Sequence, residues 1–304
     1  MAALFGAGCG PDRAGFGDTA APDVGGTFDA IDETLPDTRA ADAGFLPDVT
    51  DVASVDDNAD TPPDDVAPTD ASTPGSVFVY AHTQDELYLV DPRTFAVRSV
   101  AFFVFPSDGG DHRMTDIAIT GDNQMWGVTF DTLYRIDTGT AVCTFAARLE
   151  GSMMFNGLSF IAGASGTTER LFATTLTGDV YTVDRATGGV THVGSYGGGY
   201  GSSGDLVSVA GAGTFATVVD GNLFFPTEYL ARIDETTGAA TIIGPTTSSQ
   251  TWGLGYWGGT LYGFTNGGQL ETIDVTTGRA TPISTSSAMW WGAGVTTRAP
   301  ITHM

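Results

Sequence analysis

Alternating apolar and polar positions recur along the chain after residue 75, and they predict short β-strands. The clearest runs are five related segments, each ending in an aspartate that is followed by a Thr-containing turn and a second β-rich run. The five aspartates are Asp91, Asp137, Asp184, Asp234 and Asp274. They lie 46, 47, 50 and 40 residues apart, which is the length of one four-stranded blade of a β-propeller.

A second motif also occurs five times, out of phase with the first. It is built from small and apolar residues and starts at Thr115, Asn156, Gly204, Trp252 and Trp291. Such residues suit the innermost strand of a blade, where little side-chain volume is available near the axis. The chain enters with outer strands at 77–105 and ends with a single inner strand at 291–297, so this last strand is predicted to complete the first blade. The prediction is an all-β, five-bladed propeller at 76–299 with a short tail at 300–304.

The first 75 residues have a different composition from the rest of the chain. They hold 15 Asp and 1 Glu against only Arg13 and Arg39, a net charge of −14, together with many Pro, Ala and Thr residues. A segment with so few large apolar side chains cannot bury enough area to offset the entropy of ordering it. Residues 10–75 are therefore predicted to be a disordered acidic tether.

The extreme N-terminus, residues 1–9, resembles the end of a bacterial lipoprotein signal, in which an apolar stretch and small residues precede a cysteine. The resemblance implies lipidation of Cys9 and attachment at the outer membrane or cell surface, and an unanchored extracellular protein is the related alternative. Two features depart from the pattern: no basic residues precede the apolar run, and Gly6 occupies the position that is usually Leu. An ordinary disordered N-terminus would explain the same residues. No apolar run reaches the roughly 20 residues of a membrane-spanning helix, so a lipid would be the only membrane attachment.

Charge and residue usage exclude several classes of function. The chain carries a formal net charge of −24, which argues against binding nucleic acid or an anionic membrane surface through a basic patch. It contains no Lys, which excludes Schiff-base chemistry and a phosphate-binding P-loop lysine. With only Cys9 and Cys143 present, no disulfide framework is expected, and Cys143 is predicted to be a buried, inert thiol.

The repeats are similar to the YVTN type and other non-WD bacterial propeller repeats, most visibly at 261–266 and 270–278. The resemblance spans roughly residues 76–299. It implies the propeller fold and a tendency to bind other molecules, and it carries over no catalytic residue.

Three motifs that resemble chemical sites have simpler explanations. The repeated aspartates are predicted to accept hydrogen bonds from the backbone of their own turns, with Gly supplying a positive φ. The run at 199–204 matches a dinucleotide fingerprint as a string, but a strand rather than a helix follows it. The four His residues lie in different repeats without metal-ligand spacing, so no cofactor is expected, although an acidic loop could hold a structural Ca²⁺.

Candidate binding residues gather where the chain leads into the inner strands, because these connections meet on one face of a propeller. They combine aromatic, acidic, amide and basic side chains, which suits a glycan or a peptide. The candidate residues are His112, Arg113, Asp116, Asn156, Tyr200, Asp205, Trp252 and Trp290. Packing between blades is the competing interpretation for the tryptophans.

Two classes of function follow. The first is a monomeric binding or scaffold module at the cell surface that recognises a glycan, a peptide or a protein. The second is a propeller glycoside hydrolase or lyase-like enzyme that uses carboxylates near the central channel, which would require two carboxyl groups about 5 to 9 Å apart. Only Asp116 and Asp205 begin inner strands, so the second class has few residues to support it.

Overall fold

A computed structural model describes residues 79–302, apart from residues 152, 163–167, 223 and 225. The predicted tether and the predicted lipidation of Cys9 lie outside the described residues. All regular secondary structure in the described part is β-strand.

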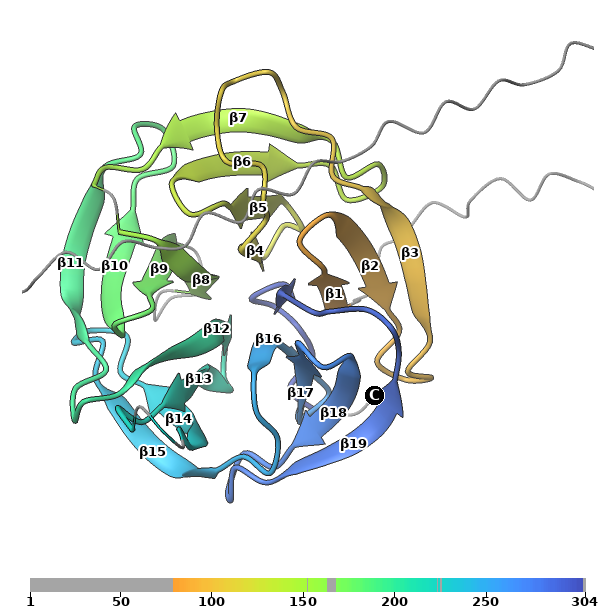
Figure 1. The fold of residues 1–304 in the computed structure, drawn as a ribbon, viewed down its shortest axis with the longest axis vertical. Helices are drawn as coiled ribbons and strands as arrows, with labels where there is room; N and C mark the ends of the chain where they lie inside the picture. The colour runs from red at the N-terminus through yellow and green to blue at the C-terminus, as the bar shows by residue number, and fades with distance from the viewer. Residues whose placement is uncertain (1–78, 152, 163–167, 223, 225, 303–304) are drawn as a thin grey trace, which may run out of the picture. The chain divides into compact units, whose positions relative to one another are not determined.

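Five four-stranded antiparallel sheets form a ring, so the prediction of a five-bladed propeller is confirmed (Figure 1). Blade 1 contains β20 (Gly292–Gly294), β1 (Val79–His82), β2 (Glu86–Val90) and β3 (Val97–Phe102). Blade 2 contains β4 (Asp116–Ile119), β5 (Met125–Val128), β6 (Thr132–Ile136) and β7 (Cys143–Arg148). Blade 3 contains β8 (Phe155–Ala162), β9 (Glu169–Thr175), β10 (Asp179–Val183) and β11 (Val190–Ser195). Blade 4 contains β12 (Gly201–Val209), β13 (Gly213–Val219), β14 (Glu228–Ile233) and β15 (Ala240–Pro245). Blade 5 contains β16 (Thr251–Trp257), β17 (Thr260–Thr265), β18 (Gln269–Ile273) and β19 (Ala280–Thr285).

The C-terminal strand closes the ring as the sequence predicts. β20 pairs antiparallel with β1, and His82 lies opposite Gly292 in this pairing. Blade 1 therefore combines strands from both ends of the described chain, which leaves no blade with an unpaired inner strand.

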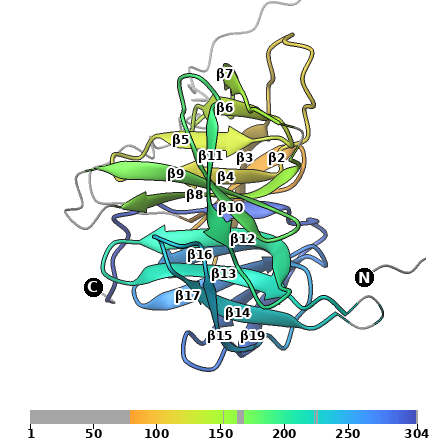
Figure 2. The ribbon, with the colours of Figure 1, turned by 90° about the vertical axis from the view of Figure 1, so that its left-hand side faces the viewer.

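The strands of each blade twist from the axis to the rim. The inner strands surround the axis in Figure 1, and the outer strands β3, β7, β11, β15 and β19 run around the circumference. In Figure 2, β8 and β9 run across the view whereas β11 runs up it, as the right-handed twist of a sheet requires.

The apolar core fills the spaces between neighbouring blades. One buried cluster joins Leu133 of blade 2 to Leu158 and Phe160 of blade 3, and another joins Leu206 of blade 4 to Phe172 of blade 3. Each blade thus buries its two faces against its neighbours, which explains why no helix is needed to cover the sheets.

The repeated aspartates make turns, as predicted. In blade 4, Asp234 accepts hydrogen bonds from the backbone N–H groups of Thr236 and Thr237, at 2.9 and 2.8 Å. These bonds hold the pKa of Asp234 below its usual range. The equivalent bonds form around the four other aspartates of the series, at Arg93, Gly139, Ala186 and Thr276.

The predicted glycine with positive φ is present in three of the five turns, whereas Phe95 in blade 1 and Ala141 in blade 2 take its place. The residue with positive φ is the fourth after the aspartate, which is Gly188, Gly238 or Gly278 in three blades. In blade 2 this position is Ala141, with φ 54°, and not Gly139. The N–H of the residue at this left-handed position donates to the carbonyl of the aspartate, at 2.8 Å for Ala141 and Asp137. Because this hydrogen bond fixes the turn, blade 2 keeps the turn without Gly.

The remaining structural predictions about single motifs are confirmed. Residues 201–209 form β12, so no helix follows the glycine-rich run. Cys143 lies in the outer strand β7, is buried and has a free thiol.

Candidate functional site

Two consecutive positions at the start of each inner strand surround the axis of the ring. We call the first position the mouth and the second the plug. The mouth residues are Thr115, Asn156, Gly204, Trp252 and Trp291. The plug residues are Asp116, Gly157, Asp205, Gly253 and Gly292. The mouth face is the face of the ring formed by the connections that lead into the inner strands, and the turn face is the opposite one, which carries the aspartate turns.

The plug holds two buried carboxyl groups. Asp116 has no exposed surface, and its Oδ1 accepts a hydrogen bond from its neighbour Ile117 N at 2.8 Å while Oδ2 accepts one from Leu158 N at 2.6 Å. Asp205 is equally buried, and its Oδ2 accepts a hydrogen bond from Leu254 N at 2.5 Å. Asp116 therefore links blade 2 to blade 3, and Asp205 links blade 4 to blade 5.

The two carboxyl groups lie within hydrogen-bonding reach of each other. Burial raises the pKa of both above the usual range, and two neighbouring buried carboxylates cannot both be charged, so the pair shares a proton. Both oxygens of Asp116 already accept N–H groups, whereas Asp205 Oδ1 has no hydrogen-bond partner among the described residues.

His82 lies beside this pair as a neutral imidazole. Its Nδ1 donates to Thr83 O at 2.8 Å, which leaves Nε2 unprotonated at 3.9 Å from Asp116 Oδ1. Complete burial lowers the pKa of His82 to about 4, so the contact with Asp116 is not an ion pair at neutral pH.

Glycines at the other plug positions make room for the carboxyl groups. A Cβ at Gly292 would lie 2.3 Å from His82 Nε2 and 2.5 Å from Asp116 Oδ1. A Cβ at Gly253 would lie 2.8 Å from the backbone of Gly292. These distances leave no room for a side chain at Gly253 or Gly292.

This arrangement does not have the geometry of a glycoside hydrolase site. Such a site places two carboxyl groups roughly 5 to 9 Å apart on either side of a bound sugar. Asp116 and Asp205 instead contact each other, are held by backbone N–H groups and have no surface to meet a substrate. They join the blades at the axis.

At the mouth, two tryptophans from neighbouring blades contact each other. The rings of Trp252 and Trp291 are 5.9 Å apart with an interplanar angle of 86°, and both side chains are partly exposed. Asn156 Nδ2 donates to Ser202 Oγ at 3.4 Å, while its Oδ1 has no partner in the described part of the chain. The mouth thus offers aromatic edges and faces together with an amide.

The backbone beside Trp252 is held by the neighbouring blade 4. Thr251 N donates to Glu228 Oε2 at 3.0 Å, and Thr217 Oγ1 donates to Thr251 O at 2.8 Å. Thr251 Oγ1 donates in turn to the buried Glu271 at 3.3 Å. A tryptophan fixed in this way loses little conformational entropy when a ligand binds.

Trp290 has a different role from the one expected of an exposed aromatic. It is 1% exposed and packs edge-on against Tyr88 and Phe264, at 5.1 and 5.7 Å between centroids. The packing interpretation therefore describes Trp290, which fixes the loop that carries Trp291. Asp116, Asp205 and Trp290 are the three sequence candidates that offer no surface to a ligand.

Tyr200, His112 and Arg113 are accessible but stand apart from the tryptophan pair. Tyr200 packs against Tyr229 at 5.7 Å between centroids. His112 Nε2 lies 2.9 Å from Asp108 Oδ1, and Arg113 forms a 2.5 Å ion pair with Asp111. His112 and Arg113 therefore mainly order the 103–115 connection.

Exposed apolar side chains also lie in connections of the mouth face. Met154, Leu176, Phe224 and Met289 are 51, 52, 84 and 59% exposed. All four lie in segments that lead into the inner or third strands of their blades.

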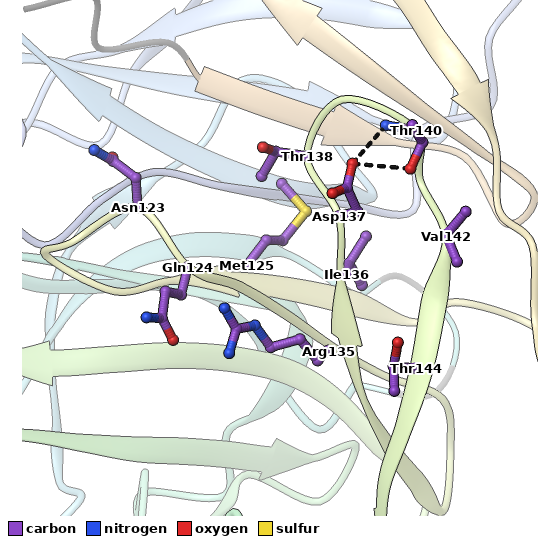
Figure 3. Close-up of a pocket in the computed structure, with 10 residues that line it drawn as sticks. All are labelled: Asn123, Gln124, Met125, Arg135, Ile136, Asp137, Thr138, Thr140, Val142 and Thr144. Atoms are coloured by element: carbon purple, nitrogen blue, oxygen red, sulfur yellow. Dashed lines mark hydrogen bonds between the residues drawn. The ribbon is translucent and has the colours of Figure 1, made fainter. Parts of the chain in front are cut away.

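The turn face contains two shallow depressions at equivalent places in blades 2 and 4. The larger, about 560 Å³, is shown in Figure 3 and is lined by polar side chains that include Asn123, Gln124 and Arg135. The smaller, about 430 Å³, contains Arg232 and Glu235. No residue of either depression was singled out from the sequence as a ligand-binding candidate.

Within residues 79–302, leaving out the gaps at 152, 163–167, 223 and 225, no group of three or more His, Cys, Asp or Glu side chains is arranged to hold a metal ion. None of the described segments is a helix long and apolar enough to cross a bilayer.

No protein-family model matches the chain, and no curated protein is similar to it in sequence. Solved structures resemble it in fold. A protein of unknown function from Bacteroides caccae is 9% identical, with a TM-score of 0.40 and coverage of 72% of this chain and 98% of that one. The computationally designed Ika8 protein is 13% identical, with a TM-score of 0.33 and coverage of 71 and 61%.

The extracellular domain of a two-component-system protein from Bacteroides thetaiotaomicron is 15% identical, with a TM-score of 0.36. The match covers 72% of this chain but only 29% of that protein. At these identities the similarity concerns the fold alone.

Proposed function

We propose that this protein is a recognition module that binds a glycan, a peptide or a protein through the mouth face of its propeller. The observation that supports this proposal is the Trp252–Trp291 pair, whose rings are partly exposed and contact each other, with the backbone beside Trp252 held by blade 4. Aromatic rings on a face that also carries the amide of Asn156 suit ligands that combine apolar faces with hydrogen-bonding groups.

In the proposed setting, Cys9 carries a lipid and residues 10–75 hold the propeller away from the membrane. The support comes from sequence: a cysteine after small residues, followed by an acidic segment that resists compaction because its charges repel. Mass spectrometry of the mature N-terminus, after expression with its native upstream region, tests the lipid. An unmodified Cys9 would contradict it.

The binding proposal is tested with glycan and peptide arrays. The probe is the full chain carrying Cys9→Ser, and it is compared with a Trp252→Ala, Trp291→Ala double variant. A Phe102→Ala, Phe145→Ala double variant is the matched control, because these exposed rings lie on outer strands at the rim. We expect binding by the parent and the control and at least tenfold weaker binding by the mouth variant.

Circular dichroism and thermal melting establish that all three proteins are folded. If the mouth variant binds as well as the parent, the site lies elsewhere. If the parent binds nothing on either array, recognition of glycans and peptides by the mouth is wrong.

A further inference from the structure

The charges of the ring are divided unequally between its two faces. All 20 acidic residues and 10 arginines that follow residue 75 belong to the described residues. At the mouth face, six acidic residues lie in the connections and two more begin β2 and β10, against two arginines, Arg113 and Arg148. The other eight arginines lie within two residues of a turn-face connection or in the segment after β20, where eight acidic residues balance them. The remaining four acidic residues are buried. The six in the mouth-face connections are Asp85, Asp108, Asp111, Asp131, Glu150 and Asp220.

The arginines of the mouth face are already paired, whereas some of its carboxylates are not. Arg113 and Arg148 form ion pairs with aspartates, at 2.5 and 3.2 Å. Asp85 and Asp220 form no ion pair within the described residues. The mouth face therefore keeps a net negative charge, which attracts cations.

One of these unpaired carboxylates lies in a turn beside Trp291. The backbone N–H of Trp291 donates to His82 O at 2.8 Å, next to the 83–85 turn. Asp85 is in this turn and is exposed. Its carboxylate is therefore available to a ligand that contacts Trp291.

Negative charge also lies beside Trp252. The buried Glu228 accepts a hydrogen bond at 3.0 Å from the N–H of Thr251, the residue before Trp252. In the described part of the chain, Glu228 forms no ion pair. It directly follows the 220–227 connection, which begins with Asp220. Both members of the tryptophan pair thus have acidic neighbours.

The rings of this pair are not covered by a cation of the protein itself. Elsewhere in the propeller, arginines lie over aromatic rings, as Arg232 lies over Phe215 at 4.6 Å. None of the described arginines lies over Trp252 or Trp291, although both tryptophans are partly exposed. A cation over the face of an indole ring is favourable, so an external cation can take the place that an arginine takes elsewhere.

Exposed apolar side chains on the same face favour a peptide over a small cation. Met154 and Leu176 are 51 and 52% exposed, and Phe224 and Met289 are 84 and 59% exposed. A peptide can carry both cationic and apolar side chains, whereas a polyamine has no apolar side chains and a neutral glycan has no charge.

We propose that the mouth face binds a basic peptide segment, with a Lys or Arg side chain against the Trp252–Trp291 pair and further basic side chains near Asp85 and Asp220. This inference rests on the recognition function proposed above and names the class of its ligand. An acidic glycan would be repelled by the same charges, and a neutral glycan would not use them.

The test is isothermal titration calorimetry of the full chain carrying Cys9→Ser in 0.15 M NaCl. The probe is a peptide of three Lys-Leu-Gly units, and the control ligand has Gln in place of each Lys. We expect the Lys peptide to bind and the Gln peptide to bind at least tenfold more weakly. Every variant retains the acidic residues 10–75, so any binding of the peptide to that segment is common to all.

Two charge variants locate the site. Asp85→Asn, Asp220→Asn should weaken binding of the Lys peptide at least fivefold. The matched control Asp184→Asn, Asp234→Asn removes the same charge from the turn face, at aspartates whose Oδ1 alone accepts the backbone N–H groups of the turn, and should stay within twofold. Equal weakening by the two variants would overturn the proposal, because only the total charge would then matter.

The tryptophan variant separates this inference from the function on which it rests. Trp252→Ala, Trp291→Ala should weaken binding of the Lys peptide at least tenfold. The inference is overturned if the Lys peptide fails to bind at millimolar concentration, if the Gln peptide binds equally, or if the tryptophan variant binds like the parent. If the arrays instead yield an uncharged ligand that needs both tryptophans, the recognition function holds and the basic peptide is wrong.

Discussion

Asp116 and Asp205 belong to inner strands of different blades, yet their carboxyl groups meet at the axis within hydrogen-bonding reach of each other. Their outward oxygens accept backbone N–H groups of Leu158 and Leu254, from blades 3 and 5. Buried carboxyl groups are costly when they lack partners, and here the partners are the neighbouring strands. The pair therefore stabilises the closed ring.

The two aspartates should respond differently to replacement by Asn. In Asp205→Asn the new amide can donate to Asp116 while its oxygen accepts Leu254 N. In Asp116→Asn the NH₂ group must face either Ile117 N or Leu158 N, so two donors oppose each other. We expect Asp116→Asn to cost about 1–3 kcal/mol of unfolding free energy and Asp205→Asn clearly less. Urea unfolding at pH 7 measures both values, and the reverse order would contradict this account of the donors around the two carboxyl groups.

The shared proton should make stability depend on pH. Burial raises the folded pKa of the pair above the unfolded value of about 3.9, so the folded state holds the proton more tightly. The bound proton contributes its full stabilisation below about pH 3.9. This contribution is lost as the pH rises through the folded pKa, by up to about 1.4 kcal/mol per pH unit. We expect the unfolding free energy of Asp205→Asn, measured at pH 4.5, 6 and 7.5, to increase relative to that of the parent as the pH rises. A constant difference would exclude this linkage.

His82 should affect stability in the opposite direction. Its pKa is lowered to about 4 by burial, and the unfolded chain binds the proton near pH 6.5. Unfolding therefore takes up a proton between about pH 4 and 6.5, and stability falls with decreasing pH by about 3 kcal/mol across this window. NMR of the imidazole Hε1 resonances should show His82 unchanged from pH 8 to pH 5. A titration midpoint near 6.5 would show that the ring is accessible to solvent.

The left-handed turn residue of blade 3 should be intolerant of a side chain. Gly188 has φ 76°, and a Cβ there would lie 1.8 Å from Arg148 O of blade 2. Gly197 has φ 72° with nothing within 4 Å, so it is a control with the same backbone strain. We expect Gly197→Ala to cost about 1 kcal/mol and Gly188→Ala at least twice as much, because the blades must separate. Equal losses in thermal denaturation would mean that strain alone matters.

Cys143 should be unreactive until the protein unfolds. The thiol is buried, and burial raises its pKa to about 12, so almost no thiolate is present at pH 8. In the Cys9→Ser chain, a disulfide reagent should label no thiol under native conditions and one per chain in denaturant. Rapid native labelling would show that the outer strand β7 opens readily.

The sequence could predict much of this architecture because the repeat carries local signals. Asp137 and its four counterparts precede turns that their own carboxylates cap, so spacing alone gives the blade length. The single inner motif at Trp291 predicts closure because an inner strand without a blade must pair with the first one. Turn residues and strand periodicity act within a few residues, and a sequence displays them directly.

Tertiary structure decided the roles of the candidate residues. Asp116 and Trp252 occupy adjacent positions of one motif, yet the first is sealed at the axis and the second is accessible at the mouth. Arg135 and Arg185 look like any two surface arginines in the sequence, but the ring places them at one tryptophan. Which groups are buried, paired or free depends on contacts between blades some 40 to 50 residues apart, because burial and pairing are properties of the closed ring and not of any one repeat.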